Sequence, residues 1–294
     1  MKRAEGYGRK RLGGLGKPIQ TVNHPPQPMT VRAGTANAAS DMRGFRHGTM
    51  SVHTSRTMML QELRLLLDWV DADAPASRYM AAIMDDNVLG KPTRFTRQRT
   101  AKHLIELYAL DPRCTLFRLL RHFWAADAGS QPMLAFLVAC ARDPLLRASM
   151  SFLFTTPLGH TVAPSAIADH LHAQYPSRFR PSTLTATAQR LASSWAQAGY
   201  LQGKHTKRRV HPHVTPIVIA FSLLLGYLCG LRGARLFEST WTQLLDCPSA
   251  ELIELTVEAS TQGWLRYKAA GAVMEITFPG LLTPAEERAA YEPH

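Results

Sequence analysis

The sequence has little cysteine, and its arrangement does not point to cross-linking or to a metal site. Four cysteines occur in 294 residues, and no two of them form a CxxC pair. Secreted disulfide-rich domains and structural zinc sites need more cysteines or closely spaced ligand pairs. The pattern therefore favours reduced thiols in a cytoplasmic protein. The four are Cys114, Cys140, Cys229 and Cys247.

Long apolar runs are also missing. The strongest, PIVIAFSLLLGYLCGL at residues 216–231, has an uncharged apolar run of about 15 residues, where a membrane-spanning helix needs about 20. The basic N-terminus has no apolar segment like that of a secretory signal. We interpret residues 216–231 as a buried core helix and expect no membrane partner. Membrane association through this segment is the weaker alternative.

The familiar signatures of catalysis are absent. The sequence contains no GxSxG, HExxH or GxGxxG motif, and GGLGKP near its start lacks the glycine and hydroxyl residue of a phosphate-binding loop. Asp85 and Asp86 are adjacent on an expected helix and point about 100° apart, so they are unsuited to one Mg²⁺ ion. His211 and His213 have no nearby cysteine or acid to complete a metal site. We predict no enzyme activity, no cofactor and no metal.

Positive charge is abundant but unevenly distributed. The formal net charge is +12 and the pI about 9.9, which favours polyanionic partners. Residues 1–49 hold nine Lys and Arg and two acids, so they carry +7, and residues 50–294 carry +5. The first segment is rich in Gly, Pro and basic residues without hydrophobic periodicity, which predicts a disordered tail. Met42 and Met50 are alternative starting points for translation.

Helical periodicity dominates residues 57–154. Apolar spacing predicts a helix over 57–69, a second ending near Gly90, and core helices over 115–154 that are interrupted by Pro132 and Pro144. Between them lies a basic stretch without an acid, for which we expect Thr96 as the helix N-cap. Cations near a helix start oppose its macrodipole, so we expect this stretch to contact phosphate. Its cations are Lys91, Arg94, Arg97, Arg99 and Lys102.

Residues 162–213 have the order of a winged helix-turn-helix. A helix beginning at Pro164 is followed by a turn, and a second helix runs from an N-cap at Ser182 to Gly199. Two short strands with a turn near Gly203 then form the expected wing. The second helix should bury Leu184, Ala188, Leu191 and Trp195 and expose a polar face suited to a DNA groove.

This window holds seven Lys and Arg and one acid, Asp169, so it carries +6. Phosphate contacts would explain this concentration of charge. The alternative is a domain that docks only on proteins. The predicted DNA-contacting residues of the window are Arg178, Arg180, Thr183, Gln189, Arg190, Lys204, Lys207, Arg208 and Arg209.

Residues 258–279 repeat this order more weakly. A helix again leads to Gly, an aromatic residue and Leu, and then to a predicted hairpin, with Gly263-Trp264-Leu265 matching Gly199-Tyr200-Leu201. Only Arg266 and Lys268 add positive charge here. We predict a second winged-helix-like unit with a structural or protein-facing role.

One family shares these features. The chain carries three segments in order: DDNVLGKPTRFTRQRTAKHLIELY, then apolar helices, then SSWAQAGYL before a basic hairpin. In this order it resembles the BrxA family of BREX phage-defence systems over roughly residues 55–280. The resemblance implies a small, largely helical protein that binds double-stranded DNA without catalysis, alongside a methyltransferase and an ATPase. It also implies that Lys91, Arg97, Lys204 and Arg208 contact the DNA backbone.

We therefore expect a mainly α, cytoplasmic protein: a helical bundle with winged helix-turn-helix elements and short β-hairpins. The expected parts are a tail at 1–49, a helical domain at 50–160, a winged-helix region at 161–215, a helical and hairpin unit at 216–282, and a tail at 283–294. The expected function is that of a DNA-binding accessory protein in antiviral defence. The alternatives are a protein-interaction adaptor in a defence complex and a winged-helix transcriptional regulator.

Overall fold

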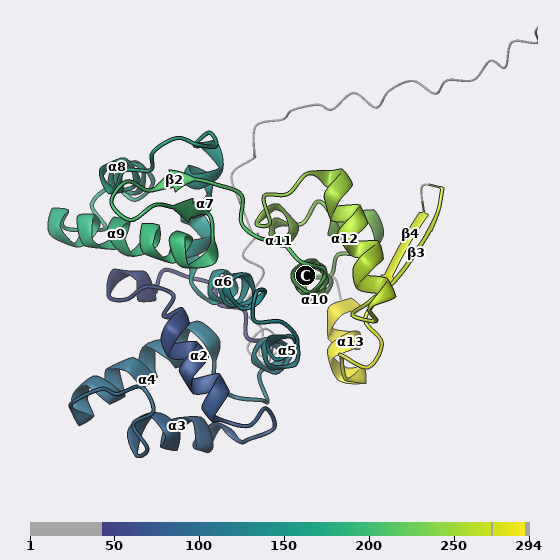
Figure 1. The fold of residues 1–294 in the computed structure, drawn as a ribbon, viewed down its shortest axis with the longest axis horizontal. Helices are drawn as coiled ribbons and strands as arrows, with labels where there is room; N and C mark the ends of the chain where they lie inside the picture. The colour runs from purple at the N-terminus through teal and green to yellow at the C-terminus, as the bar shows by residue number, and fades with distance from the viewer. Residues whose placement is uncertain (1–42, 272, 292–294) are drawn as a thin grey trace, which may run out of the picture.

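The computed structural model describes residues 43–271 and 273–291, and this part of the chain is mainly helical (Figure 1). Two antiparallel sheets of two strands each account for the named strands within these residues. The predicted class, mainly α with short hairpins, is confirmed at this level. The tail predicted over residues 1–49 lies largely outside the described residues, but its last seven residues are ordered. Arg43 is buried and donates to the Leu228 carbonyl at 2.7 Å.

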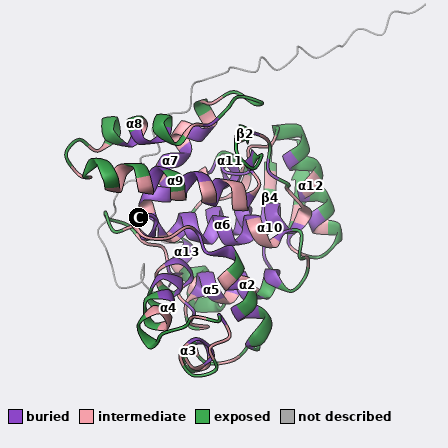
Figure 2. Cartoon of the chain, turned by 60° about the vertical axis from the view of Figure 1, so that its left-hand side comes forward, coloured by how far each residue is buried: buried purple, intermediate pink, exposed green. Residues whose placement is uncertain are grey.

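The N-terminal half is a group of helices arranged around α6, which lies at the centre of the molecule (Figure 1). Residues 133–141 of this helix are buried on all sides, as its nearly uninterrupted apolar sequence requires, and Figure 2 shows the buried segments converging there. The elements are η1 (Val52–Thr54), α2 (Leu60–Trp69), α3 (Ala76–Met84), α4 (Arg94–Tyr108), α5 (Thr115–Trp124) and α6 (Gln131–Arg142).

Residues 144–209 form what we call the first helix–hairpin unit. It consists of α7 (Pro144–Thr155), α8 (Pro164–Gln174), α9 (Pro181–Ala198), β1 (Leu201–Gln202) and β2 (Arg208–Arg209). Leu201 pairs with Arg209 across the hairpin, and an isolated bridge joins Thr161 to Arg208. The second predicted helix ends as expected at Gly199, whose φ of 95° is in the left-handed region.

Residues 216–277 form the second helix–hairpin unit. It consists of α10 (Pro216–Leu228), η2 (Gly233–Leu236), α11 (Thr240–Gln243), α12 (Ser249–Thr261), β3 (Arg266–Ala270) and β4 (Val273–Thr277). α12 ends before Gly263, which has a φ of 85°, and the predicted hairpin follows it. The predicted repeat of helix, left-handed glycine and hairpin is therefore present in the backbone.

The core is continuous across the boundaries expected from sequence. One cluster of buried apolar side chains extends from Val52 to Ala290. The interpretation of residues 216–231 as a core helix is confirmed, because α10 is only 13 residues long and almost wholly buried. Among the described residues, no helix combines the length and apolarity needed to cross a bilayer.

Three local expectations differ from the structure. The N-cap of α4 is Thr93 rather than Thr96, because the Thr93 hydroxyl accepts the Thr96 N–H at 3.1 Å. The N-cap position of α9 is Arg180 rather than Ser182, since Pro181 already occupies the first helical position. The C-terminal segment expected as a tail forms α13 (Pro284–Tyr291), whose Glu286 pairs with Arg118 at 2.6 Å.

Candidate nucleic-acid interface

The loop between β1 and β2 presents unpaired positive charge to solvent. Gly203 has a φ of 113°, and a Cβ at this position would clash with the Thr206 carbonyl oxygen, so the turn needs glycine. Lys204 and Arg208 are exposed, and Lys207 is half-buried. Within the described residues, neither lysine side chain makes a hydrogen bond or ion pair, whereas Arg208 donates to the Gly159 carbonyl at 3.0 Å. The loop therefore leaves its two lysine charges to solvent or a ligand.

Arg209 was predicted as a fourth wing contact, and the structure places it elsewhere. Its side chain is only 3% exposed and pairs with Asp246 at 2.7 Å. It also donates to the Leu153 carbonyl at 2.9 Å. Alternation along a strand puts neighbouring residues on opposite faces, so Arg208 faces outward and Arg209 faces the core. Arg209 is thus a buried structural residue and cannot act as a phosphate contact.

The outward side of α9 is polar but carries little charge. Gln189 and Thr185 are exposed and Thr183 is half-buried. Arg190, predicted to read bases, is half-buried and donates from Nη1 to the Thr54 carbonyl of η1 at 2.7 Å. The exposed side is therefore a neutral, hydrogen-bonding surface.

The two cations that precede α9 differ from each other. Arg180 is exposed at the helix start. Arg178 lies over the Tyr175 and Phe179 rings, at 4.8 and 4.9 Å from their centroids, and donates to the Thr49 carbonyl. Arg180 is thus the cation of this pair that is presented to solvent.

The basic stretch at residues 91–102 divides into anchored and exposed cations. Lys91 pairs with Glu62 at 3.1 Å, and Arg97 donates to the Met84 carbonyl at 2.9 Å. Arg94, Arg99 and Lys102 are exposed on α4. Within the described residues, the side chains of Arg94 and Lys102 have no hydrogen bond or ion pair. Three of the five predicted cations are therefore exposed, whereas Lys91 and Arg97 are bound within the fold.

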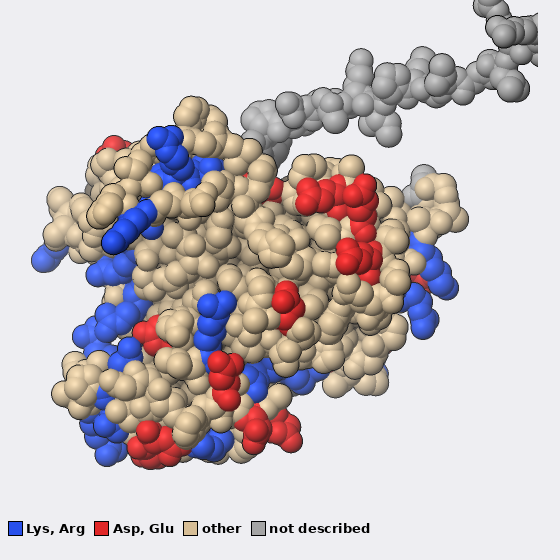
Figure 3. All heavy atoms as spheres, in the orientation of Figure 1, with Lys and Arg blue, Asp and Glu red and all other residues tan. Residues whose placement is uncertain are grey.

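The fold brings α4 and α9 to the same edge of the molecule. The short η1 segment packs against both helices. Figure 3 shows Lys and Arg gathered along the edge from α8 and α9 down to α4, whereas acidic side chains gather over α12. We call the first of these surfaces the basic edge. Its exposed cations are Arg94, Arg99, Lys102, Arg180, Lys204 and Arg208.

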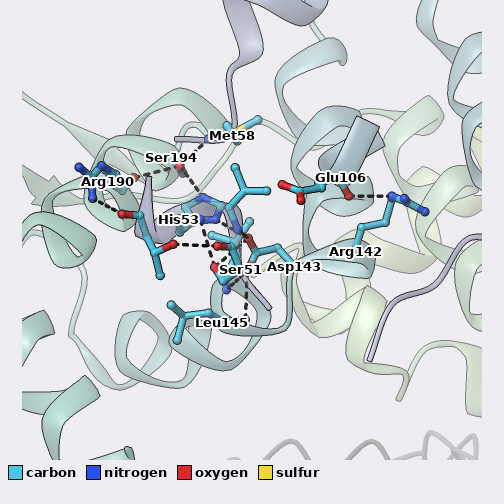
Figure 4. Close-up of polar contacts among 12 residues, drawn as sticks. Ser51, His53, Met58, Glu106, Arg142, Asp143, Leu145, Arg190 and Ser194 are labelled. Carbon is cyan, nitrogen blue, oxygen red and sulfur yellow. Dashed lines mark hydrogen bonds and ion pairs between the residues drawn. The ribbon is translucent and has the colours of Figure 1, made fainter. Parts of the chain in front are cut away.

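A buried polar network fixes η1 against α9, and the sequence analysis missed it. His53 Nδ1 lies 2.9 Å from Asp143 Oδ2, and His53 Nε2 lies 2.9 Å from Ser194 Oγ (Figure 4). These residues come from η1, the start of α7 and α9. The order of the groups is that of a hydrolytic Ser–His–Asp arrangement. All three residues are buried, with at most 1% exposure.

The surroundings of the network show that it serves the fold. The Ser194 hydroxyl donates to the Arg190 carbonyl at 3.0 Å and accepts the Met58 N–H at 2.9 Å, so it is not free to attack a substrate. Burial alone would raise the pKa of Asp143, but His53, with its charge and hydrogen bond, and the Leu146 N–H hold it at about 2. The carboxylate is therefore ionised and caps α7. An Asp-Pro pair opening a helix was the only local signal of this role.

No metal centre or deep catalytic cleft stands out in the described part of the chain. No group of three or more His, Cys, Asp or Glu side chains is placed to share a metal ion there. One hollow of about 390 Å³ opens to solvent beside Asp73, Ser77 and Asp111. The sequence matches no family model and no curated protein.

Proposed function

We propose that this protein binds double-stranded DNA through its basic edge and catalyses no reaction on it. The observation that carries the proposal is the β1–β2 loop, where the ammonium groups of Lys204 and Lys207 have no protein partner among the described residues. Such cations gain from replacing condensed counterions on phosphate, and they give affinity without sequence preference.

The order of elements in the first helix–hairpin unit supports a winged-helix interpretation. α7, a bridging segment at Thr161, α8, α9 and the β1–β2 hairpin follow one another as the parts of a winged helix-turn-helix do. In that arrangement α9 is the recognition helix and the hairpin loop is the wing. Gln189 and Thr185 would face the groove. Because these two side chains offer few hydrogen-bonding atoms to the base edges, we expect a weak preference for DNA sequence.

The second part of the interface is α4. Its first turn contains no acid, and the exposed Arg94 lies there, near the positive end of the helix macrodipole. A phosphate there would relieve this repulsion. Because η1 joins α4 to α9, a duplex on the first helix–hairpin unit could extend along the same edge.

The biological setting that we propose follows from the resemblance to the BrxA family: an accessory role in phage defence, with a methyltransferase and an ATPase among the partners. Trp195 and Tyr200, which carry part of that resemblance, are fully buried. These two residues therefore serve the core, and the proposed DNA contacts depend on the exposed cations.

A second candidate function, that of a protein-interaction adaptor, is favoured by one feature. The exposed side of α12 combines three acids with Ile253 and Val257, which are 38% and 49% exposed. This surface would repel DNA and suits a protein partner. The acids are Glu251, Glu254 and Glu258.

The test is fluorescence anisotropy with a labelled random duplex over salt from about 50 to 200 mM. The Lys204/Lys207→Ala variant is compared with Arg266/Lys268→Ala, which removes two exposed cations from the other hairpin. We expect the first variant to lower the slope of log affinity against log salt by about 2, and the control to leave it unchanged.

Three other outcomes would change the proposal. Equal losses of DNA affinity in both variants would show that binding depends on the net charge of the protein and not on the β1–β2 loop. No binding by the parent chain at low salt would leave the adaptor as the better function. A strong preference for one palindromic site over random duplex would instead favour a transcriptional regulator.

A further inference from the structure

An exposed aromatic side chain lies inside the basic part of α4. Phe95, in the first turn of this helix, is 67% exposed. The rest of the helix is anchored in the core through Leu104, Leu107 and Tyr108, each fully buried. The helix start, with its aromatic ring, is thus held rigidly at the surface by the packed half of the same helix.

Three exposed cations share the helix with this ring. The Arg99 guanidinium lies over the Phe95 ring, 5.7 Å from its centroid, and the side chains of Arg94 and Lys102 are exposed on the same helix without partners among the described residues. Arg97 is fixed by its hydrogen bonds to the Met84 and Lys91 carbonyls. An exposed ring on a helix that also carries Arg94, Arg99 and Lys102 suits one ligand well: a base flanked by phosphates, because the ring stacks on the base and the cations pair with the backbone.

We propose that α4 binds an unpaired nucleobase stacked on Phe95, with Arg94, Arg99 and Lys102 on the neighbouring phosphates. The proposal rests on the proposed DNA binding and adds the form of DNA that is preferred: a duplex next to a single strand. The faces of bases inside a duplex are already stacked, so the ring gains a partner only where a base is unpaired.

The geometry favours nucleic acid over a lipid surface. A helix that lies in a bilayer interface needs a broad apolar face directed at the lipid. In α4 the apolar face formed by Leu104 and Leu107 is turned into the core, and Phe95 is the one large apolar side chain in its first turn. An isolated ring among cations therefore suits base stacking better than insertion.

The experiment compares a blunt duplex with the same duplex carrying a single-stranded overhang, for the full chain and three variants. We expect the parent to bind the overhang substrate more tightly. Phe95→Ala should weaken that binding about tenfold and leave the blunt duplex unchanged. Phe95→Trp should keep the preference. Val273→Ala, which removes an apolar side chain that is 72% exposed on the other hairpin, should change neither.

The outcomes separate this inference from the proposed function. If the parent shows no preference for the overhang, or Phe95→Ala weakens both substrates equally, stacking is overturned while duplex binding stands. If the parent ignores blunt duplex but Phe95→Ala still abolishes overhang binding, the duplex proposal fails and stacking stands. Absence of all DNA binding overturns both. Loss of binding by Phe95→Ala to anionic phospholipid vesicles, with DNA binding unchanged, overturns stacking in favour of a membrane surface.

Discussion

The two helix–hairpin units share one backbone arrangement, but their surfaces carry opposite charge. In each, a long helix ends at a left-handed glycine, followed by an aromatic residue and a buried leucine that lead into a hairpin. Gly199 and Gly263 have φ values of 95° and 85°. Leu201 and Leu265 are 6% and 3% exposed. The first unit presents cations at its hairpin loop, whereas the second presents acids along α12.

The hairpins also differ in whether an acid lies beside their lysines. In the second, Lys268 is directly opposite Glu275, so part of its positive charge has a cross-strand acidic neighbour. In the first, the loop lysines have no acidic partner in the described part of the chain. The comparison teaches that the shared backbone does not determine the partner, and that the chemistry of the exposed side chains does.

The units also differ in how their first helices are anchored. α7 is capped by the buried, ionised Asp143, which is tied to His53. α10 is capped by Thr215, a neutral residue that also bonds Ser130 at 2.6 Å. Four predictions test these contrasts.

The largest expected effect is on the anchor of the first unit. Asp143→Asn replaces an ionised acceptor with a group that cannot accept every N–H and O–H now directed at it, so we expect a loss of about 3 kcal/mol in the free energy of unfolding. Thr215→Ala, the equivalent cap in the second unit, should cost only about 1 kcal/mol. Urea unfolding measures both, and equal losses would remove the contrast.

The same anchor makes stability sensitive to acid. Because the pKa of Asp143 is lowered from 3.8 to about 2 in the folded chain, its contribution is present above about pH 4 and is lost as the pH falls toward 2. The contribution is roughly 2 kcal/mol. Urea unfolding followed from pH 7 to acid should show this loss in the parent and a flatter profile in Asp143→Asn. Parallel pH profiles in the parent and in Asp143→Asn would contradict the assignment of this acid sensitivity to Asp143.

A smaller effect is expected from reversing the charge of α12. Glu251/Glu254/Glu258→Lys should make the second unit attract DNA, raise affinity about tenfold at low salt and steepen the salt slope by up to about 3. Replacing the same acids with Gln is the matched control, which removes repulsion without adding phosphate contacts. If the Lys variant binds DNA no better than the Gln variant, the shape of the second unit prevents docking whatever its charge.

The smallest effect tests the shared backbone. Gly199→Ala and Gly263→Ala each force a side chain into the left-handed region and should each cost about 1 kcal/mol. A Cβ at Gly199 would have its nearest neighbour at 3.7 Å and one at Gly263 would meet nothing within 4 Å, so crowding adds little at either position. Calorimetry should give similar drops in Tm, and a neutral result at one glycine would show that the repeat is only approximate.

The sequence by itself determined the local structure. Apolar periodicity predicted the core helices, Gly199 and Gly263 marked the ends of α9 and α12, and the short apolar run of α10 indicated a buried helix. These features depend on residues a few positions apart, so a single sequence contains them. The segment 283–294 was missed because α13 is stabilised by a distant partner, with Glu286 bonded to Arg118.

Only the tertiary structure decided which charges are available. Arg208 and Arg209 are neighbours with the same chemistry, yet one is exposed and the other pairs with Asp246 in the core. His53 and Ser194 are separated by 141 positions and meet only because α9 packs on η1. The same packing places α4 and the first helix–hairpin unit on one edge. Burial and partners arise from contacts between distant segments, and spacing along the chain does not contain that information.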